Sequence, residues 1–280
     1  MRIKTFGWRH NELDQISRIE QGFIELGHKI VEDDPDLIYC NNDFFDAPLL
    51  YAEKYPNAKK IFNILDLQVD NPNYNLAKVK DQLLKADAVT CISYTVQKQI
   101  LDKLGIEANV IFNPIKDVYL HPSIEKQPLI LYVGRANDPN KRFNFIREAF
   151  FFNENLIQVC GSENPFFGKY LGIVNDEDLN YLYNQSRFVL LPSKFEGLGL
   201  PMIEAMVCGS IPITCSDNPT ALELCPPKFI CDPNPKVLMS KICDLMVNYE
   251  ENREIAIEYG NHYSELMRKK RVAKNILKCL

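Results

Sequence analysis

Two carboxylates and two glycines lie close together in the stretch 195–205. Glu196 and Glu204 have seven residues between them, and Gly197 and Gly199 lie in that interval. Glycine lets a ligand approach the main chain closely, and the free N–H groups at a helix start favour an anion such as a diphosphate. Carboxylates on either side of the anion would accept hydrogen bonds from vicinal hydroxyls. Hydroxyls, diphosphate and hydroxyls in that order describe a nucleotide sugar.

The flanking residues predict a strand, a loop and a helix N-terminus. The apolar run 188–191 has the length and composition of a buried parallel strand. Pro201 suits a first helical turn, where its missing N–H would have no partner. The mostly apolar residues 202–207 predict a short buried helix that ends at Gly209. Glu204 is therefore expected in the first helical turn.

The E-x7-E spacing around Gly-Leu-Gly-Leu-Pro resembles the signature of retaining GT-B glycosyltransferases of family GT4, the glycosyl transferases group 1. The resemblance implies that Glu196 is catalytic and orients the donor sugar, and that Glu204 holds the ribose. The alternative is that both carboxylates only cap and solvate a helix end. Between them, the residues expected to bind the donor are Gly197, Leu198, Gly199 and Leu200.

A second set of charges follows another predicted strand. Arg135 comes directly after Val133-Gly134, and Lys141 follows six residues later. The resemblance places Arg135 and Lys141 over the donor diphosphate as catalytic residues, because fixed cations stabilise a leaving phosphate. The alternative is two solvated cations in a polar loop. Arg142 occupies a position where the family often has glycine.

Further donor contacts are expected at two other strand ends, at Gly161 and at Ile173 and Val174. The resemblance implies that main-chain groups near 173–175 hold the nucleobase. Main-chain recognition leaves no side-chain signature, so a UDP-sugar and a GDP-sugar both stay open. The resemblance also implies that no cofactor and no metal ion are required.

The first half of the chain offers fewer candidates. Trp8 and His10 follow the first predicted strand and are interpreted as lining the acceptor side, although a lone histidine is commonly a surface or core residue. Asp66 lies where relatives often have His-Asp, and here the histidine is absent. Asp66 is expected either to bind an acceptor hydroxyl or to cap the next loop.

The pattern of apolar runs and amphipathic segments predicts an α/β fold with two Rossmann-like, doubly wound domains facing a central cleft, as in GT-B. Predicted strands of the first half are 3–7, 28–31, 37–40, 60–65, 87–92 and 109–112, with helices at 12–26 and 93–104. Predicted strands of the second half are 129–133, 156–159, 170–174, 188–191 and 211–214. Expected domains are 1–113 for the acceptor and 128–262 for the donor, joined by a linker at 114–127 and followed by a basic helix at 263–280 that crosses back to the first domain.

The composition of the chain indicates its cellular location and excludes one class of binding partner. The net charge of −5 gives no reason for broad nucleic-acid binding. Nine cysteines without a C-x-x-C pair indicate buried thiols in a reducing cytosol. The first six residues turn polar too early for a signal peptide. A cytoplasmic protein is expected, with peripheral membrane contact as an option through Arg268, Lys269, Lys270 and Arg271, which otherwise solvate a terminal helix.

These observations predict a metal-independent, retaining glycosyltransferase that moves a hexose from a nucleotide diphosphate sugar to a hydroxyl of a glycan, lipid or other glycoside. The alternative is a non-catalytic sugar-nucleotide-binding subunit or regulator of the same fold. A nicotinamide dehydrogenase would need G-x-G-x-x-G after its first strand, and neither Gly7 nor Gly134 supplies it. The sequence leaves the sugar, the base, the acceptor and the oligomeric state open.

Overall fold

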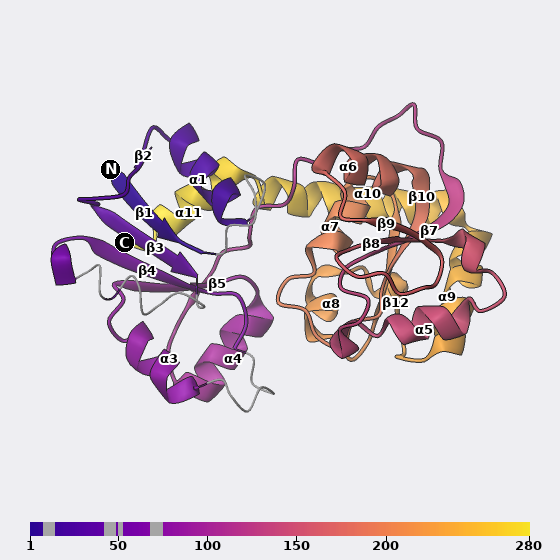
Figure 1. Cartoon of the computed structure of the whole chain (residues 1–280), viewed down its shortest axis with the longest axis horizontal. Helices are drawn as coiled ribbons and strands as arrows, with labels where there is room; N and C mark the ends of the chain where they lie inside the picture. Colours follow the sequence, from indigo (N-terminus) through magenta and orange to yellow (C-terminus); the bar gives the residue numbers. More distant parts are fainter. Residues whose placement is uncertain (8–14, 42–48, 50–52, 68–74) are drawn as a thin grey trace. The chain divides into compact units, whose positions relative to one another are not determined.

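The chain forms two compact α/β units in a computed structural model that describes residues 1–7, 15–41, 49, 53–67 and 75–280 (Figure 1). Unit 1 comprises Met1–Pro114 and Leu266–Leu280, and unit 2 comprises Ile115–Glu265. Each unit has its own six-stranded sheet in which every strand pair is parallel.

The sheet of unit 1 has the strand order β2-β1-β3-β4-β5-β6. Its strands are β1 (Arg2–Phe6), β2 (Lys29–Ile30), β3 (Leu37–Asn41), β4 (Lys59–Ile64), β5 (Ala88–Cys91) and β6 (Asn109–Val110). β3 is buried at all five positions, as expected for a central parallel strand covered on both faces. Among the described residues, helices α3 and α4 lie on one side of this sheet, and α1 and α11 on the other (Figure 1).

The described helices of unit 1 are α1 (Gln15–Glu25), α3 (Leu76–Leu83), α4 (Tyr94–Leu104) and α11 (Lys269–Leu277). Ser93 caps α4, since its hydroxyl accepts from the Val96 N–H at 3.2 Å. α11 packs on α1. Its buried face, Val272, Ala273 and Ile276, joins the same apolar core as Phe23 of α1.

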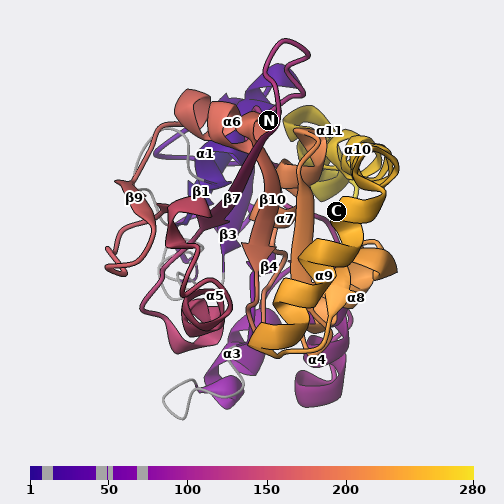
Figure 2. The same cartoon turned by 90° about the vertical axis from the view of Figure 1, so that its right-hand side faces the viewer.

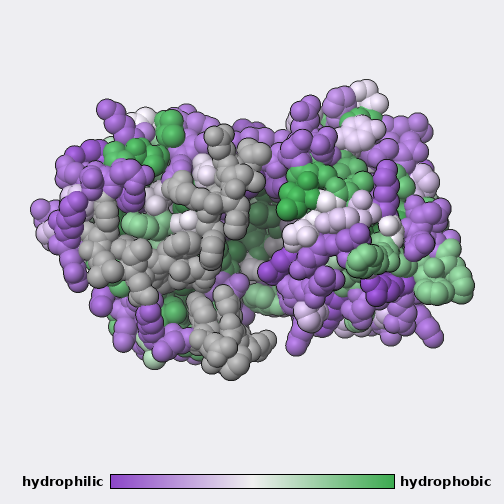
Figure 3. Space-filling view, viewed as in Figure 1, coloured by the Kyte–Doolittle hydropathy of each residue, from purple (hydrophilic) through white to green (hydrophobic). Residues whose placement is uncertain are grey.

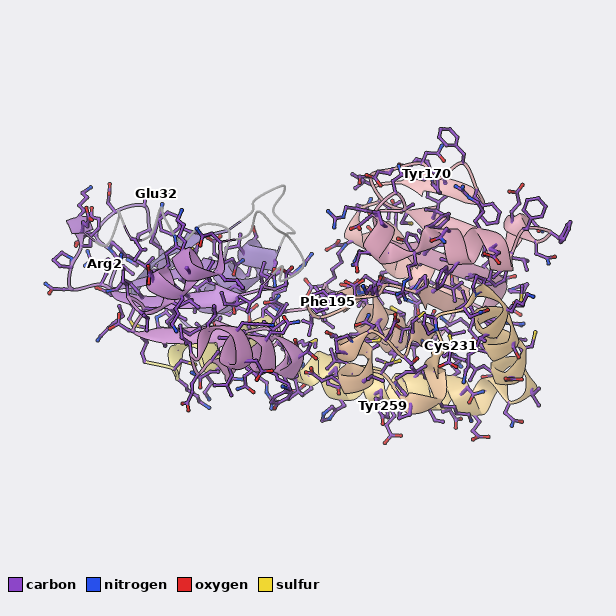
Figure 4. All side chains as sticks on the ribbon, turned by 90° about the horizontal axis from the view of Figure 1, so that it is seen from below. Arg2, Glu32, Tyr170, Phe195, Cys231 and Tyr259 are labelled. Atoms are coloured by element: carbon purple, nitrogen blue, oxygen red, sulfur yellow. The ribbon has the colours of Figure 1, made fainter. Side chains whose placement is uncertain are left out.

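The sheet of unit 2 has the order β12-β11-β10-β7-β8-β9. Its strands are β7 (Gln127–Val133), β8 (Ile157–Cys160), β9 (Lys169–Gly172), β10 (Ser186–Leu191), β11 (Ile211–Cys215) and β12 (Ile230–Cys231). Figure 4 labels Tyr170 and Cys231 on the two edge strands, β9 and β12. The chain winds outward in both directions from the pair β7 and β10, which is therefore the topological switch point where open α/β sheets bind ligands.

The helices of unit 2 are α5 (Phe143–Ala149), α6 (Asp176–Gln185), α7 (Leu200–Val207), α8 (Pro219–Leu224), α9 (Pro235–Val247) and α10 (Tyr249–Leu266). α6 packs on β7 and β10, α7 packs on β10 and β11, and the two helices contact each other. α9 contacts β11 and β12 (Figure 2). Hydrophilic residues predominate on the face of unit 2 that Figure 3 shows. The described residues include no membrane-crossing helix, because none combines the required length with an apolar sequence.

Two expected boundaries differ from the structure. Residues 115–127, expected as part of a linker, belong to unit 2, because the Tyr119 and His121 amides donate to Asn180 and Asn184 of α6 at 3.0 and 2.7 Å. The single helix expected at 263–280 is instead the end of α10 and a separate α11. The chain turns at Arg268, whose ψ of 133° is extended.

Candidate active site

The loops that follow β7 and β10 meet at the switch point of unit 2. The Lys141 ammonium lies 2.6 Å from Oε1 of Glu196, and both side chains are mostly shielded from water. The two residues are 55 positions apart in the chain. Adjacent parallel strands end at the same edge of a sheet, and so their following loops bring the cation and the carboxylate together.

Asn140 fastens these two loops to each other. Its side-chain amide donates to the Phe195 carbonyl at 2.8 Å, and its side-chain oxygen accepts from the Phe195 N–H at 3.0 Å. The Lys194 N–H also donates to the Asn140 main-chain carbonyl at 2.9 Å. Figure 4 labels Phe195 in this loop. The three hydrogen bonds fix the main chain on both sides of the Lys141–Glu196 pair.

The glycine loop leads directly into α7. Gly199 precedes the helix with φ of 70° and ψ of 46°, a left-handed conformation that favours glycine. Leu198 is buried, which anchors the loop, while Gly197 is half-buried. Pro201 lies in the first turn of α7, as expected. The N-terminal end of α7, with its partial positive charge, therefore lies directly after the loop that carries Glu196.

Glu204 lies in the second turn of α7 and not in the first, because the helix begins at Leu200. Glu204 is only 2% exposed to solvent. Oε2 accepts from the Tyr183 hydroxyl at 3.0 Å, and the Lys116 N–H lies 3.5 Å from Oε1. Burial raises the pKa of Tyr183 well above its ordinary value, with the Glu204 charge as a second cause, so this phenol stays protonated as a donor.

Arg135 and Arg142 have other partners. Arg135 is largely exposed and pairs with Asp138 at 2.7 Å. Arg142 binds both oxygens of Asp217, at 2.9 and 2.6 Å, and its φ of 50° explains why glycine fits this position. The hydrogen bond from Arg142 holds the pKa of Asp217 below its ordinary value. Of the two neighbouring cations, Lys141 contacts Glu196 and Arg142 does not point to the same carboxylate.

The ends of β7 and β8 approach each other closely. A Cβ added to Gly161 would lie 2.1 Å from the Gly134 carbonyl oxygen, so only glycine fits there. Beyond β9, Ile173 is 80% exposed and Val174 is half-buried. Burial raises the pKa of the Cys160 thiol to about 11, which keeps it protonated and unreactive at neutral pH.

The acceptor-side candidates are only partly described. Trp8 and His10 lie outside the described residues. Asp66 is half-buried and follows β4, at the carboxyl edge of the sheet of unit 1. Within the described residues, no group of three or more His, Cys, Asp and Glu side chains is arranged to hold a metal ion.

Sequence reasoning missed the residues that hold the site in place. Asn140 was part of a polar loop with no distinguishing spacing, and Tyr183 lies in α6, a helix that was not predicted from the sequence. Lys116 pairs with Asp176 at 3.0 Å and places its amide toward Glu204. Thr220 donates from its hydroxyl to the Glu196 carbonyl at 2.5 Å. No sequence signal could have identified these residues, because each of their contacts joins segments that are distant in the chain.

Chemically, the carboxyl edge of unit 2 combines a shielded ammonium–carboxylate pair, a glycine loop at a helix N-terminus and a buried carboxylate. A cation and helix amides can hold a phosphate group, and carboxylates can accept from hydroxyls. The arrangement therefore suits an anion that carries hydroxyl groups on both sides.

Comparison with known proteins agrees with this chemistry. Residues 168–263 match the family model of glycosyl transferases group 1. O-antigen chain mannosyltransferase B of Escherichia coli is 40% identical over 93 residues, which are 33% of this chain and 24% of that protein. O-antigen chain mannosyltransferase RfbU of Salmonella typhimurium is 28% identical over 166 residues, 52% of this chain and 46% of that protein. The match thus spans a quarter to a half of the length of these relatives.

Solved structures match both units. Sucrose-phosphate synthase from Thermosynechococcus elongatus superposes with a TM-score of 0.78 at 14% identity, covering 99% of this chain and 97% of that one. HepE from Anabaena, in complex with UDP and glucose, gives 0.79 at 14% identity, with coverages of 99% and 98%. The GT-B fold predicted from the sequence is confirmed, as is the resemblance to glycosyl transferases group 1.

Proposed function

We propose that this chain, with its GT-B fold and its match to glycosyl transferases group 1, moves a sugar from a UDP- or GDP-sugar to an acceptor hydroxyl. The observation that carries the proposal is the 2.6 Å contact of Lys141 with Glu196, at the switch point of unit 2. It puts a cation and a carboxylate where a diphosphate and the attached sugar would meet.

In the proposed reaction, the bond between the anomeric carbon and the diphosphate oxygen breaks, and the acceptor oxygen bonds to the same face of that carbon. The acceptor proton passes to the leaving phosphate. Lys141 and Arg135 neutralise the charge that develops on the diphosphate, so no metal ion is required. Arg135 would exchange its present partner, Asp138, for the phosphate.

The carboxylates have separate roles in this proposal. Glu196 accepts from the hydroxyls of the donor sugar and keeps the face of the anomeric carbon that bears the diphosphate turned toward the acceptor hydroxyl. Glu204 accepts from the ribose hydroxyls. The amides of Gly197 to Leu200 contact the diphosphate, and main-chain groups at Gly161, Ile173 and Val174 contact the nucleoside.

The relatives favour a particular substrate class. Two of them are O-antigen chain mannosyltransferases, which supports a hexose donor and a growing glycan as the acceptor. Acceptor contacts are proposed for Trp8, His10 and Asp66 of the first unit. A cytosolic location belongs to the proposal and is supported by nine free cysteines, seven of them buried.

A panel of radiolabelled UDP-, GDP- and ADP-sugars tests the function through slow donor hydrolysis and transfer to O-antigen-type oligosaccharides. Lys141→Ala should lower kcat/KM by about 100-fold or more, because a fixed charge on the leaving phosphate is lost. The matched control is Lys194→Ala, which removes an exposed ammonium from the loop of Glu196 and should change kcat/KM less than about twofold.

Two results would contradict the enzyme. Equal turnover by the wild type and Lys141→Ala would remove the proposed role of the cation. Tight binding of one donor without hydrolysis or transfer to any acceptor would instead indicate a non-catalytic sugar-nucleotide-binding subunit. Anomer analysis by NMR of the product tests retention, and an unchanged rate in excess EDTA tests the absence of a metal requirement.

Weak contact of the basic C-terminal segment with anionic membranes is part of the proposal. Lys270 and Arg271 are exposed, whereas the apolar face of α11 is used against α1. Contact would therefore be electrostatic, without insertion. Co-sedimentation with phosphatidylserine vesicles should be lost at about 0.5 M salt and in Lys270→Gln/Arg271→Gln. Equal sedimentation of the wild type and this variant would exclude the contact.

A further inference from the structure

Lys126, directly before β7, extends its ammonium into a cluster of oxygen atoms within unit 2. Nζ donates to the main-chain carbonyls of Tyr183, Ser186 and Cys208 at 2.8, 3.0 and 2.9 Å. It also lies 2.8 Å from the hydroxyl oxygen of Ser210. An ammonium has three protons, and this one faces four oxygen atoms.

The three carbonyls belong to two helix ends. Tyr183 is in the last turn of α6 and Ser186 caps its C-terminus, while Cys208 caps the C-terminus of α7. The last carbonyls of a helix lack partners within it and carry partial negative charge. One ammonium therefore satisfies the ends of two helices at once. Burial lowers the pKa of Lys126 to about 7, whereas carbonyls, which only accept, favour the charged form.

Ser210 completes the cluster. Its hydroxyl oxygen lies 2.5 Å from the Tyr183 carbonyl and 2.6 Å from the Ser186 carbonyl. Since the hydroxyl proton serves those carbonyls, the oxygen is left to accept from Lys126. The side chains at 126 and 210 thus hold the end of α6 jointly, and both are tied to the turn that follows α7.

Both helix ends that Lys126 joins form hydrogen bonds with Glu204. The Tyr183 hydroxyl donates to Oε2 of Glu204 at 3.0 Å, and the Cys208 N–H donates to the Glu204 carbonyl at 3.2 Å. Lys126 is therefore connected to Glu204 through two intermediate residues. Tyr183 connects it to the side chain of Glu204, and Cys208 connects it to the main chain of Glu204.

We propose that Lys126 is a positioning residue for the nucleoside half of the donor, because it locks the ends of α6 and α7 together and so fixes the Glu204 carboxylate. This inference rests on the proposed function, in which Glu204 holds the ribose. Without the ammonium, three carbonyls lose their common donor and the two helix ends relax relative to each other. Lys141 and Glu196 are held by other contacts, through Asn140 and Thr220.

The proposal predicts a split between KM and kcat. Lys126→Met should raise KM for the donor and Kd for UDP or GDP by about 10- to 150-fold, the range of one lost hydrogen bond to a charged group. The value of kcat at saturating donor should stay within about threefold of the wild type. The matched control is Lys241→Met, because Lys241 is a half-buried lysine of α9 that donates to the carbonyl of Lys228 at 3.3 Å, and it should leave Kd unchanged.

The test is a double-mutant cycle measured by isothermal titration of UDP and GDP into the wild type, Lys126→Met, Glu204→Gln and the double variant. If Lys126 acts through Glu204, Lys126→Met should weaken binding in the wild-type background and by less than about twofold in the Glu204→Gln background. Ser210→Ala removes one oxygen of the cluster and should weaken binding about threefold to tenfold. If Lys126→Met does not fold, Ser210→Ala replaces it in the double-mutant cycle with Glu204→Gln.

The outcomes separate the two proposals. Additive losses in the cycle, or a lowered melting temperature with unchanged Kd, would overturn the positioning role and leave the proposed function standing. A wild-type protein that binds neither UDP nor GDP would overturn the proposed function, and the positioning role with it.

Discussion

At the scale of single residues, the Arg142–Asp217 pair shows how an arginine can occupy a left-handed backbone position, where glycine is favoured. Arg142 keeps the left-handed backbone, and its side chain forms a two-fold hydrogen bond to Asp217 and lies over the ring of Phe145. The residue thus fastens the loop after β7 to the loop after β11, next to Lys141. Its charge is used within the protein and is compensated before any donor binds.

This pair gives a pH-dependent prediction. The hydrogen bond from Arg142 lowers the pKa of Asp217 below 3.8 in the folded state. Stability from the pair is therefore fully present above that value and is lost as the pH falls through the lowered pKa. Asp217→Asn should lower Tm by about 1–3 °C at neutral pH, and this difference should shrink as the pH falls below 3.8 and through the lowered pKa.

The control for that measurement is Arg142→Ala. In this background, Asp217→Asn should no longer change Tm at neutral pH, because the partner that lowers the pKa is gone. A Tm difference between the wild type and Asp217→Asn that persists unchanged into acid would show that the carboxylate stabilises the loop independently of its charge.

The residues that carry charge were predictable, but their partners were not. Glu196 and Lys141 were selected through the resemblance to family GT4, and the predicted strand ends before them supported the choice. Arg135, selected on the same grounds, is exposed and bound to Asp138. Spacing along the chain sets which edge of the sheet a residue lies on, whereas the direction of a long, flexible side chain is set by tertiary contacts.

At the scale of elements, the buried central strands and the edge strands β2 and β9 were predicted, whereas one edge strand was missed and another was predicted too long. β3, β7 and β10 fall where the apolar runs placed them. The two-residue edge strand β12 was missed, and the strand expected at 109–112 is limited to β6. An edge strand pairs on one side only, so it needs few residues of strand type and leaves a weak sequence signal.

Asn140 joins two elements of the site, the loop after β7 and the loop after β10. Its side chain pairs in both directions with the main chain of Phe195, 55 residues away. The order of strands brings the two loops together, and that order follows from crossover connections and not from local sequence. A sequence can therefore nominate the loops of a site, while their mutual attachment emerges only from the topology.

At the scale of the whole molecule, unit 1 is completed by the end of the chain. The segment from Leu266 belongs to unit 1 although unit 2 separates it from the rest in sequence. α11 is basic on its exposed side, and from the sequence this segment was interpreted from its charge and not from its apolar face. The apolar face explains where the segment lies, because Val272, Ala273 and Ile276 are fully or almost fully buried.

The docking of α11 predicts a local effect on stability. Ile276→Ala should lower the free energy of unfolding of unit 1 by about 2–5 kcal/mol, because it leaves a cavity between α11 and the core that includes Phe23. Hydrogen exchange followed by mass spectrometry should report faster exchange in α1 and β1 and unchanged exchange in β7 and β10, because each unit has its own core.

Lys274→Ala is the matched control, since it truncates an exposed side chain on the same helix and should leave exchange in α1 unchanged. Uniformly faster exchange across both sheets in Ile276→Ala would contradict the argument, because it would mean that the two units unfold as one cooperative body. Faster exchange confined to unit 1 would show that the last residues of the chain stabilise the first strands independently of unit 2.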